Sequence, residues 1–253
     1  MYILSKIISE SLLSLYPVFV KNIHLPMQTQ LWSRFFTYTV ISFFFIDKSI
    51  ISLLMSVPGM LLMVVTILHV YVSYKGFMLL ESGISYALFY TYPLFIYLGT
   101  YYTIDPYFIF PMIGTWIMYQ DNKKINLLGI GMILLAAITE AMIYFIVRRI
   151  KTPNPWNHVF ISYVLGAILF STASTQNVTL SLAINAIIGL VGYLLRFIAM
   201  THLTPILYSF LSYIGVIMAF VYGVIFNHEI ITLPKIIATL FILIPSINQN
   251  IYK

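Results

Sequence analysis

The sequence predicts an all-α polytopic membrane protein with ten transmembrane helices, arranged as two inverted five-helix repeats. Composition is the first observation behind this prediction. Hydrophobic residues make up 61% of the 253 positions, charged residues only 8%, and the mean hydropathy is +0.96. Soluble domains carry about 25% charged residues, so this chain has too little charge to cover a surface facing water. The other two observations are long apolar segments and similarities between the two halves.

The apolar segments are separated by short polar or Pro/Gly interruptions. A transmembrane helix needs about 20 apolar residues, or roughly 17 at the short end. By this criterion we expect ten membrane spans, at about 2–20, 31–46, 51–74, 80–101, 106–119, 127–147, 156–174, 180–202, 205–226 and 233–247. The first has neither a charged start nor a cleavage site, so we expect a retained span rather than a signal peptide.

The two halves resemble each other at two offsets. Ile8-Ser9-Glu10-Ser11 is similar to Ile138-Thr139-Glu140-Ala141. A second offset, of 122 positions, pairs Gly83 with Pro205, Tyr86 with Tyr208, Asp105 with Asn227 and Ile109 with Ile231. Five spans are an odd number, so the second repeat must enter the membrane from the opposite side. We therefore expect a first repeat at 1–122 and a second at 123–253, an architecture typical of transporters.

Composition also narrows the classes of partner and chemistry. The formal charge of +6 forms no basic stripe, so we expect a lipid bilayer rather than nucleic acid as partner. There are no cysteines, which excludes disulfides and thiolate catalysis. No spacing of His, Asp and Glu makes a metal site, so we expect neither a metal nor another cofactor. The basic cluster from Arg148 to Lys151 favours cytoplasmic termini in a plasma or inner membrane.

Two carboxylates lie inside apolar segments, where an acidic side chain costs several kcal/mol and usually faces a wet cavity. Glu10 has Lys6 one helical turn away, and this pair could also reach the membrane interface together. Glu140 has no partner within its own helix, and the nearest cation in sequence, Arg148, is two turns away. We therefore expect Glu140 to be unpaired, and we expect both Glu140 and Glu10 to couple protons and to bind substrate.

Aromatic side chains are candidates for the wall of a substrate cavity. Ring faces attract cations, although Tyr and Phe at helical spacing are more often packing residues. The substrate-binding candidates from the fourth and ninth spans are Tyr86, Phe89, Tyr90, Tyr208 and Tyr213.

Two basic residues support a different substrate. Lys75 and Arg196 fall at nearly matched places near the ends of the third and eighth spans. If they point inward, they would bind an anion such as a sugar phosphate or nucleotide sugar. If they point outward, they are anchors at the membrane interface.

Several stretches resemble the drug/metabolite transporter superfamily. The segment from Asn227 to Leu243 resembles the end of an EamA-type domain, and the span from Leu127 through Glu140 to Arg148-Arg149 resembles its start. Gly83-Ile84-Ser85-Tyr86-Ala87-Leu88-Phe89 resembles a conserved run of the small multidrug resistance family. That resemblance implies substrate-site roles for Glu10, Tyr86 and Phe89.

We therefore expect a secondary active transporter, not an enzyme. It would move a small amino acid, amine or other cationic or amphipathic solute by alternating access, coupled to protons, as a monomer or homodimer. One alternative is the anion exchanger that uses Lys75 and Arg196. The alternative of another class is an intramembrane enzyme or a subunit of one, but no nucleophile elbow or metalloprotease motif occurs in the sequence.

Overall fold

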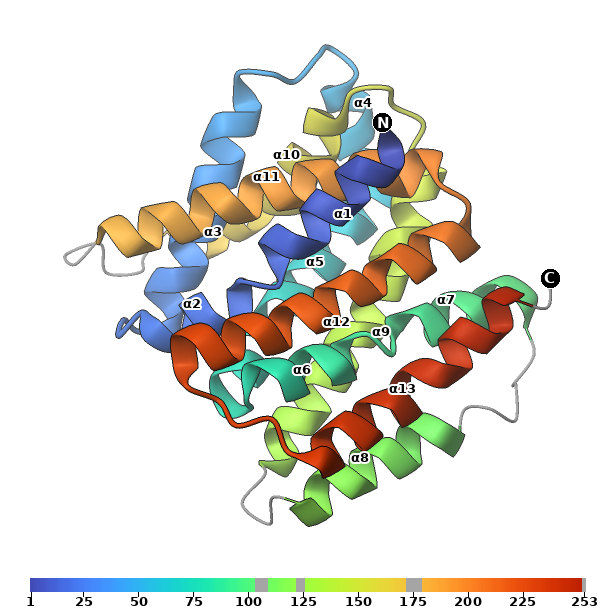
Figure 1. Cartoon of the computed structure of the whole chain (residues 1–253). Helices are drawn as coiled ribbons and strands as arrows, with labels where there is room; N and C mark the ends of the chain where they lie inside the picture. Colours follow the sequence, from blue (N-terminus) through green and yellow to red (C-terminus); the bar gives the residue numbers. More distant parts are fainter. Residues whose placement is uncertain (103–108, 122–125, 172–178, 252–253) are drawn as a thin grey trace.

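The computed structural model describes residues 1–102, 109–121, 126–171 and 179–251, and this part of the chain is helical (Figure 1). The first half forms α1 (Tyr2–Leu13), α2 (Tyr16–Asn22), α3 (Met27–Phe43), α4 (Ile50–Leu54), α5 (Val57–Leu79), α6 (Ser82–Phe89), α7 (Tyr92–Tyr101) and α8 (Ile109–Asp121). The second half forms α9 (Leu127–Arg149), α10 (Pro155–Leu169), α11 (Leu180–His202), α12 (Pro205–Asn227) and α13 (Leu233–Ile251). Asp105 and the expected boundary at 122/123 lie outside the described residues.

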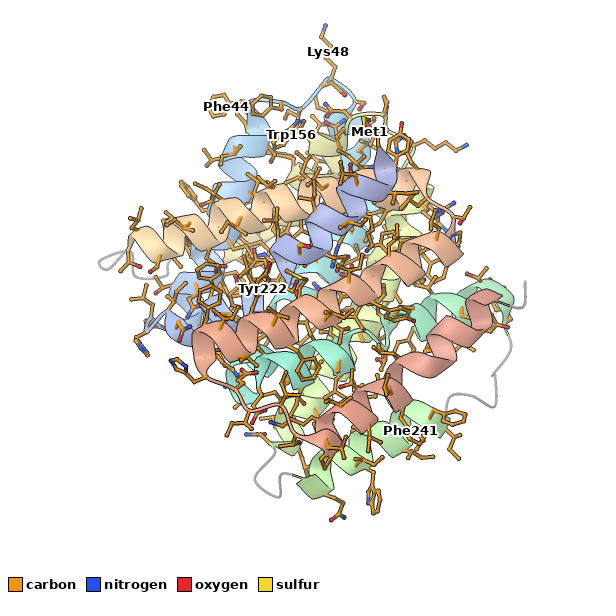
Figure 2. All side chains as sticks on the ribbon, viewed as in Figure 1. Met1, Phe44, Lys48, Trp156, Tyr222 and Phe241 are labelled. Carbon is orange, nitrogen blue, oxygen red and sulfur yellow. The ribbon has the colours of Figure 1, made fainter. Side chains whose placement is uncertain are left out.

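Five stretches in the described part of the chain are long and apolar enough to cross a membrane: 2–22, 57–79, 127–149, 180–202 and 207–227. The distribution of side chains fits a lipid environment. Large apolar side chains such as Val64 and Leu68 point outward, while Glu10, Glu140 and Arg196 are buried. Phe44 lies at the periphery in Figure 2 with 75% of its surface exposed. An apolar exterior around a charged interior identifies a multi-pass integral membrane protein. The expected total of ten spans stays a prediction.

Prolines divide two of the expected spans. The segment predicted as one span at 2–20 consists of α1 and α2, with Pro17 in the first turn of α2. Pro17 has no N–H to offer the carbonyl of Leu13, and the hydroxyl of Tyr86 donates to that carbonyl instead. The segment at 80–101 is likewise divided into α6 and α7, with Pro93 in the first turn of α7. Both interruptions lie in segments that line the molecule's centre.

The third expected span is shifted along the chain. It was predicted at 51–74, but α5 begins at Val57, with Pro58 in its first turn, and continues to Leu79. Lys75 and Gly76 therefore lie inside the helix, beyond the expected end at residue 74. A Cβ atom at Gly76 would collide with the side chain of Ile133, so glycine at this position lets α5 and α9 pack closely.

The main helix contacts join the two halves of the chain. Helices of the first half pack on helices of the second half: α1 packs on α11 and α12, α3 packs on α10, and α5 packs on α9. The pair α8 and α13 forms a separate contact at one side of the molecule (Figure 1). As a result, the centre of the protein is built from α1, α5, α6, α9, α11 and α12, which carry most of the residues singled out from the sequence.

Candidate functional site

Five titratable side chains meet in the buried centre of the protein. Lys6 and Glu10 come from α1, His69 from α5, Glu140 from α9 and Arg196 from α11. Each of them is at most 1% exposed. We call these five residues the central cluster. Its members come from both halves of the chain, so the fold assembles it from segments that are far apart in sequence.

Arg196 connects the two carboxylates. Its Nη1 donates to Oε1 of Glu140 at 2.8 Å, and its Nη2 lies 3.1 Å from both carboxylate oxygens of Glu10. A guanidinium group is planar and carries five N–H donors, so one arginine can bind two carboxylates at once. The expectation that Glu140 is unpaired is therefore wrong. Its partner is Arg196, which is distant in sequence but adjacent in the fold.

Glu10 has the larger set of partners. Besides Arg196, it accepts hydrogen bonds from the ammonium group of Lys6 and the hydroxyl group of Tyr90. Ser9, next to it, donates to the carbonyl of Gly192 at 2.8 Å and fixes α1 against α11. The pair of Lys6 and Glu10 expected from the sequence is present. Because both side chains are fully buried, it does not extend to the membrane interface.

His69 faces the second carboxylate. Its Nδ1 lies 3.1 Å from the carbonyl oxygen of Ala136, which can only accept, so Nδ1 carries a hydrogen. Nε2 then lies 3.5 Å from Oε2 of Glu140, an oxygen without a hydrogen-bond partner in the described part of the chain. In neutral histidine with this tautomer, Nε2 is an acceptor, as is the carboxylate. A proton on either group would convert this contact between two acceptors into a hydrogen bond.

Aromatic residues predicted from the sequence surround the cluster. The Lys6 ammonium lies 3.5 Å from the centre of the Tyr208 ring, and the Phe89 ring lies 5.9 Å from His69 and from Tyr86. Tyr90 binds Glu10 directly. Tyr213 is also buried, but its hydroxyl group has no hydrogen-bond partner among the described residues. Lys75 is half-buried near the end of α5 and forms none of the cluster's ion pairs among the described residues.

A second buried cation, Arg34 on α3, was not selected as a site residue from the sequence. It is 3% exposed and donates to the hydroxyl of Tyr163 at 3.1 Å. Its guanidinium carbon lies 4.7–5.6 Å from five tyrosine ring centres: Tyr16, Tyr38, Tyr74, Tyr163 and Tyr193. The signal in the sequence was a lone arginine within the expected span at 31–46, the same kind of signal that singled out Glu10.

A narrow cavity lies between Arg34 and Arg196. Its volume is only about 10 Å³, and it is lined by both arginines, His69, Ser73 and the apolar or aromatic side chains Leu13, Tyr16, Phe77, Tyr86, Phe89 and Tyr193. The cavity thus brings the central cluster into contact with the tyrosines around Arg34. Among the candidates named from the sequence, it includes Tyr86, Phe89 and Arg196.

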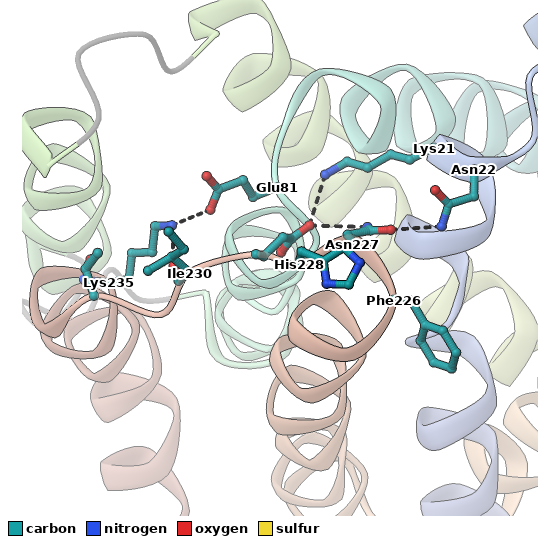
Figure 3. A pocket seen from close by; sticks show the side chains of 10 residues that line it. Lys21, Asn22, Glu81, Phe226, Asn227, His228, Ile230 and Lys235 are labelled. Atoms are coloured by element: carbon teal, nitrogen blue, oxygen red, sulfur yellow. Dashed lines mark hydrogen bonds and ion pairs between the residues drawn. The ribbon is translucent and has the colours of Figure 1, made fainter.

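A larger hollow, of about 800 Å³, opens at the end of the molecule where α12 connects to α13 (Figure 3). Its charged residues pair across the two halves. Lys21 lies 3.2 Å from Oε1 of Glu229, Lys235 pairs with Glu81, and Asn22 donates to Asn227 at 2.9 Å. We call these residues the end contacts. This hollow is wide and open, and its polar groups bind one another, whereas the central cavity contains unpaired donors.

Glu229 also anchors the start of α6. It accepts from the backbone N–H groups of Ser82 at 2.7 Å and Gly83 at 3.3 Å, where the helix dipole favours a negative charge. Burial alone would raise the pKa of Glu229, but the Ser82 N–H and Lys21 outweigh that effect and hold its pKa below the ordinary value of 4.5. Because the charged form is favoured in the folded state, Glu229 stabilises the fold at neutral pH and loses this effect in acid.

Replacing Glu229 with Gln should therefore lower the melting temperature at pH 7. The difference from the wild type should shrink as the pH falls below about 4.5 and through the lower pKa of the folded state. Thermal unfolding of the detergent-purified protein at several pH values measures this effect. An equal loss of stability at every pH would show that the negative charge of Glu229 is not the cause of its stabilising effect. A matched control is Asn227→Ser, which alters the same end contacts without changing charge.

Comparison with known proteins agrees with this organisation. The family model described as "EamA-like transporter family" matches residues 127–247, which run from α9 into α13. No curated protein matches the chain. The chain also matches a crystal structure of another protein, with a TM-score of 0.65 at 14% sequence identity. The match covers 99% of this chain and 96% of the other chain. At that identity the likeness concerns the fold alone. Residues 127–247, the second half of the chain, are thus similar to the EamA-like transporter family of the drug/metabolite transporter superfamily.

Proposed function

We propose that the protein is a secondary active transporter that moves a small solute by alternating access, without catalysing a chemical reaction. The observation that carries this proposal is the position of Arg196, which binds Glu10 of the first half and Glu140 of the second in the buried centre. Charged groups inside a membrane protein usually mark the path of a substrate or ion. In transporters built from repeats, that path lies between the repeats.

The pattern of helix contacts supports two inverted repeats, at 1–122 and 123–253. If the halves are exchanged span by span, the contact of α1 with α11 becomes the contact of α9 with α5. The contact of α1 with α12 likewise becomes that of α9 with α6 and α7. All of these contacts are present, and α3 with α10 and α8 with α13 map onto themselves. A contact pattern that survives this exchange favours a two-fold axis through the centre and ten spans, an even number that places both termini on the same side of the membrane.

Alternating access requires one end to close while the other opens. The end contacts join α2 and α6 of the first half to the segment between α12 and α13 of the second. We infer that these pairs close one end of the pathway. The interruptions at Pro17, seven residues after Glu10, and at Pro93, three residues after Tyr90, offer places where the helices bend without breaking further hydrogen bonds.

Proton coupling is part of the proposal, and His69 with Glu140 is the supporting geometry. The two acceptors that face each other at 3.5 Å form a site for one proton. A proton on Glu140 would also weaken its ion pair with Arg196, which spans the two halves. Binding a proton and separating the halves would then depend on the same carboxylate. Glu10 is held separately by Lys6, Tyr90 and Arg196.

The test is proton movement in vesicles that contain the purified protein and an internal pH dye. The solutes added outside are benzyltrimethylammonium, a cation, and phenyl phosphate, an anion. We expect one of them to drive proton flux through the wild type and Glu140→Gln to abolish that coupling. Asp47→Asn, which changes a carboxylate outside both the central cluster and the end contacts, should retain coupling. Solute flux with no proton movement in the wild type would contradict coupling, and unchanged coupling in Glu140→Gln would remove Glu140 from the mechanism.

The alternative of anion exchange draws support from different residues than the sequence indicated. Arg196 is an ion-pair partner of two carboxylates, and Lys75 lies outside the central cluster. Among the described residues, Arg34 is the buried cation that has no carboxylate partner. The position of Arg34 therefore bears on whether the substrate is an anion or a cation.

A further inference from the structure

Arg34 and Arg196 line the same buried cavity, and we propose that they bind the anionic group of the transported solute, a carboxylate or a phosphate. The proposal deepens the function proposed above and rests on it. It concerns the chemistry of the substrate, for which the two carboxylates alone had indicated a cation. Four observations carry it: the missing partner of Arg34, the balance of buried charge, the unpaired nitrogens of both arginines, and the lining of the cavity.

Arg34 lacks an acidic partner in the part of the chain that the structure describes. The five carboxylates whose side chains the structure describes have other partners: Glu10 and Glu140 bind Arg196, Glu81 binds Lys235, Glu229 binds Lys21, and Asp47 accepts from Ser49 and Asn157. A buried charge is costly unless an opposite charge or strong hydrogen bonds compensate it. Tyrosine rings compensate part of the cost by attracting the guanidinium, but they carry no net charge.

The buried charges of the centre do not balance without a ligand. Lys6, Arg34 and Arg196 are cations, and Glu10 and Glu140 are anions. With His69 neutral, the described groups of this centre carry one net positive charge. A monovalent anion would bring the sum to zero. A cationic solute would raise it to two positive charges in a site shielded from water.

Both arginines retain a donor for such an anion. The Nε atoms of Arg34 and Arg196 are buried and have no hydrogen-bond partner among the described residues. The two guanidinium groups also lie against one ring, with their carbons 4.7 Å and 5.4 Å from the centre of Tyr193. Guanidinium groups bind carboxylates and phosphates through paired N–H donors, so two of them on one cavity suit an anion.

The rest of the cavity indicates the remainder of the solute. Leu13, Phe77 and Phe89 supply apolar surface, and Ser73 supplies one hydroxyl group. In this conformation the cavity has a volume of only about 10 Å³, far below the roughly 300–1,000 Å³ of ordinary ligand pockets, so a solute enters only when the pathway opens. The lining, rather than the size, favours a small organic anion with an apolar or aromatic body.

The test measures binding to the purified protein in detergent, which does not depend on transport. The probes share one ring: benzoate and phenyl phosphate as anions, benzamide as the neutral analogue and benzylamine as the cation. We expect at least one anion to raise the melting temperature saturably, and benzamide and benzylamine to bind at least about ten-fold more weakly. Equal or tighter binding of benzylamine by the wild type would overturn the proposal without any variant.

Variants then locate the site. Arg34→Gln should weaken binding of the anion by about ten-fold or more and reduce its preference over benzamide, whereas Arg34→Lys should retain part of that preference. Without ligand, Arg34→Gln should melt at or above the wild-type temperature, because it removes an uncompensated buried charge. Arg149→Gln, at the exposed end of α9, is the matched control and should bind like the wild type. Unchanged anion affinity in Arg34→Gln would contradict the proposal, as would the loss of stability expected of a purely structural arginine.

These outcomes separate the two proposals. Anion binding without solute flux in vesicles would support the proposed anion site and contradict the proposed transport function. Coupled flux of benzyltrimethylammonium without anion binding would support transport and contradict the anion site.

Discussion

Replacing Arg196 with leucine is expected to destabilise the protein by about 3–5 kcal/mol and to abolish transport. Two ion pairs meet at this one guanidinium, and its removal leaves Glu10 and Glu140 buried with Lys6 as the remaining cation of the central cluster. Removing one partner of a buried ion pair leaves a charge without compensation, which is the source of the cost. Thermal unfolding in detergent and solute flux in vesicles measure the two effects.

Arg196→Lys is the informative companion variant. It keeps the positive charge but lacks the planar fork that reaches both carboxylates, so it should lose less stability than Arg196→Leu while still losing most transport. Arg149→Leu, at the exposed end of α9, should change neither property. If Arg196→Leu retained the wild-type melting temperature, the bridge between Glu10 and Glu140 would not be part of the folded protein.

Replacing Glu10 with Gln should destabilise the protein more than replacing Glu140 with Gln. Glu10 accepts from Lys6, Tyr90 and Arg196, so its loss leaves two cations facing a neutral amide. Glu140 has one close partner, Arg196 at 2.8 Å, and an oxygen without a hydrogen bond. We expect a loss of about 3–5 kcal/mol for Glu10→Gln, as for other broken buried pairs, and a smaller loss for Glu140→Gln.

The same thermal unfolding experiment compares the two variants directly. Glu81→Gln, whose carboxylate pairs with Lys235 at the end of the molecule, is the control for removing a carboxylate outside the central cluster. A larger loss for Glu140→Gln than for Glu10→Gln would mean that the hydrogen bonds around Glu10 do not determine the stability of the cluster.

Helix positions were largely predictable because apolar length is a local property of the sequence. α9, α11 and α12 lie within a few residues of the expected spans at 127–147, 180–202 and 205–226. Glu10 and Glu140 were also predictable as buried groups, since a lone carboxylate in an apolar segment must avoid lipid. Their burial could be predicted from the apolar residues around them in sequence, without knowing their distant partners.

Partners could not be predicted in the same way. Arg196 is far from both carboxylates in sequence, and only the packing of α1 and α9 near α11 brings the three together. From the sequence alone, Glu140 is expected to be unpaired, and Arg196 is either an anion-binding residue or an interfacial anchor. Arg34 was missed because its five tyrosine neighbours come from several different helices, a contact set that no local pattern encodes.

The central claim is that the cavity beside Arg196 becomes accessible to water during the transport cycle, and cysteine labelling tests it most directly. The chain has no cysteines, so single-cysteine variants need no background changes. Ser73 lines the cavity, while Leu68, on the same helix, points outward at 43% exposure. In vesicles, a charged, membrane-impermeant thiol reagent should label Ser73→Cys, and benzoate or phenyl phosphate should slow the labelling. Leu68→Cys, facing lipid, should stay unlabelled. Labelling of Leu68→Cys but not Ser73→Cys, from either side of the membrane, would contradict the account.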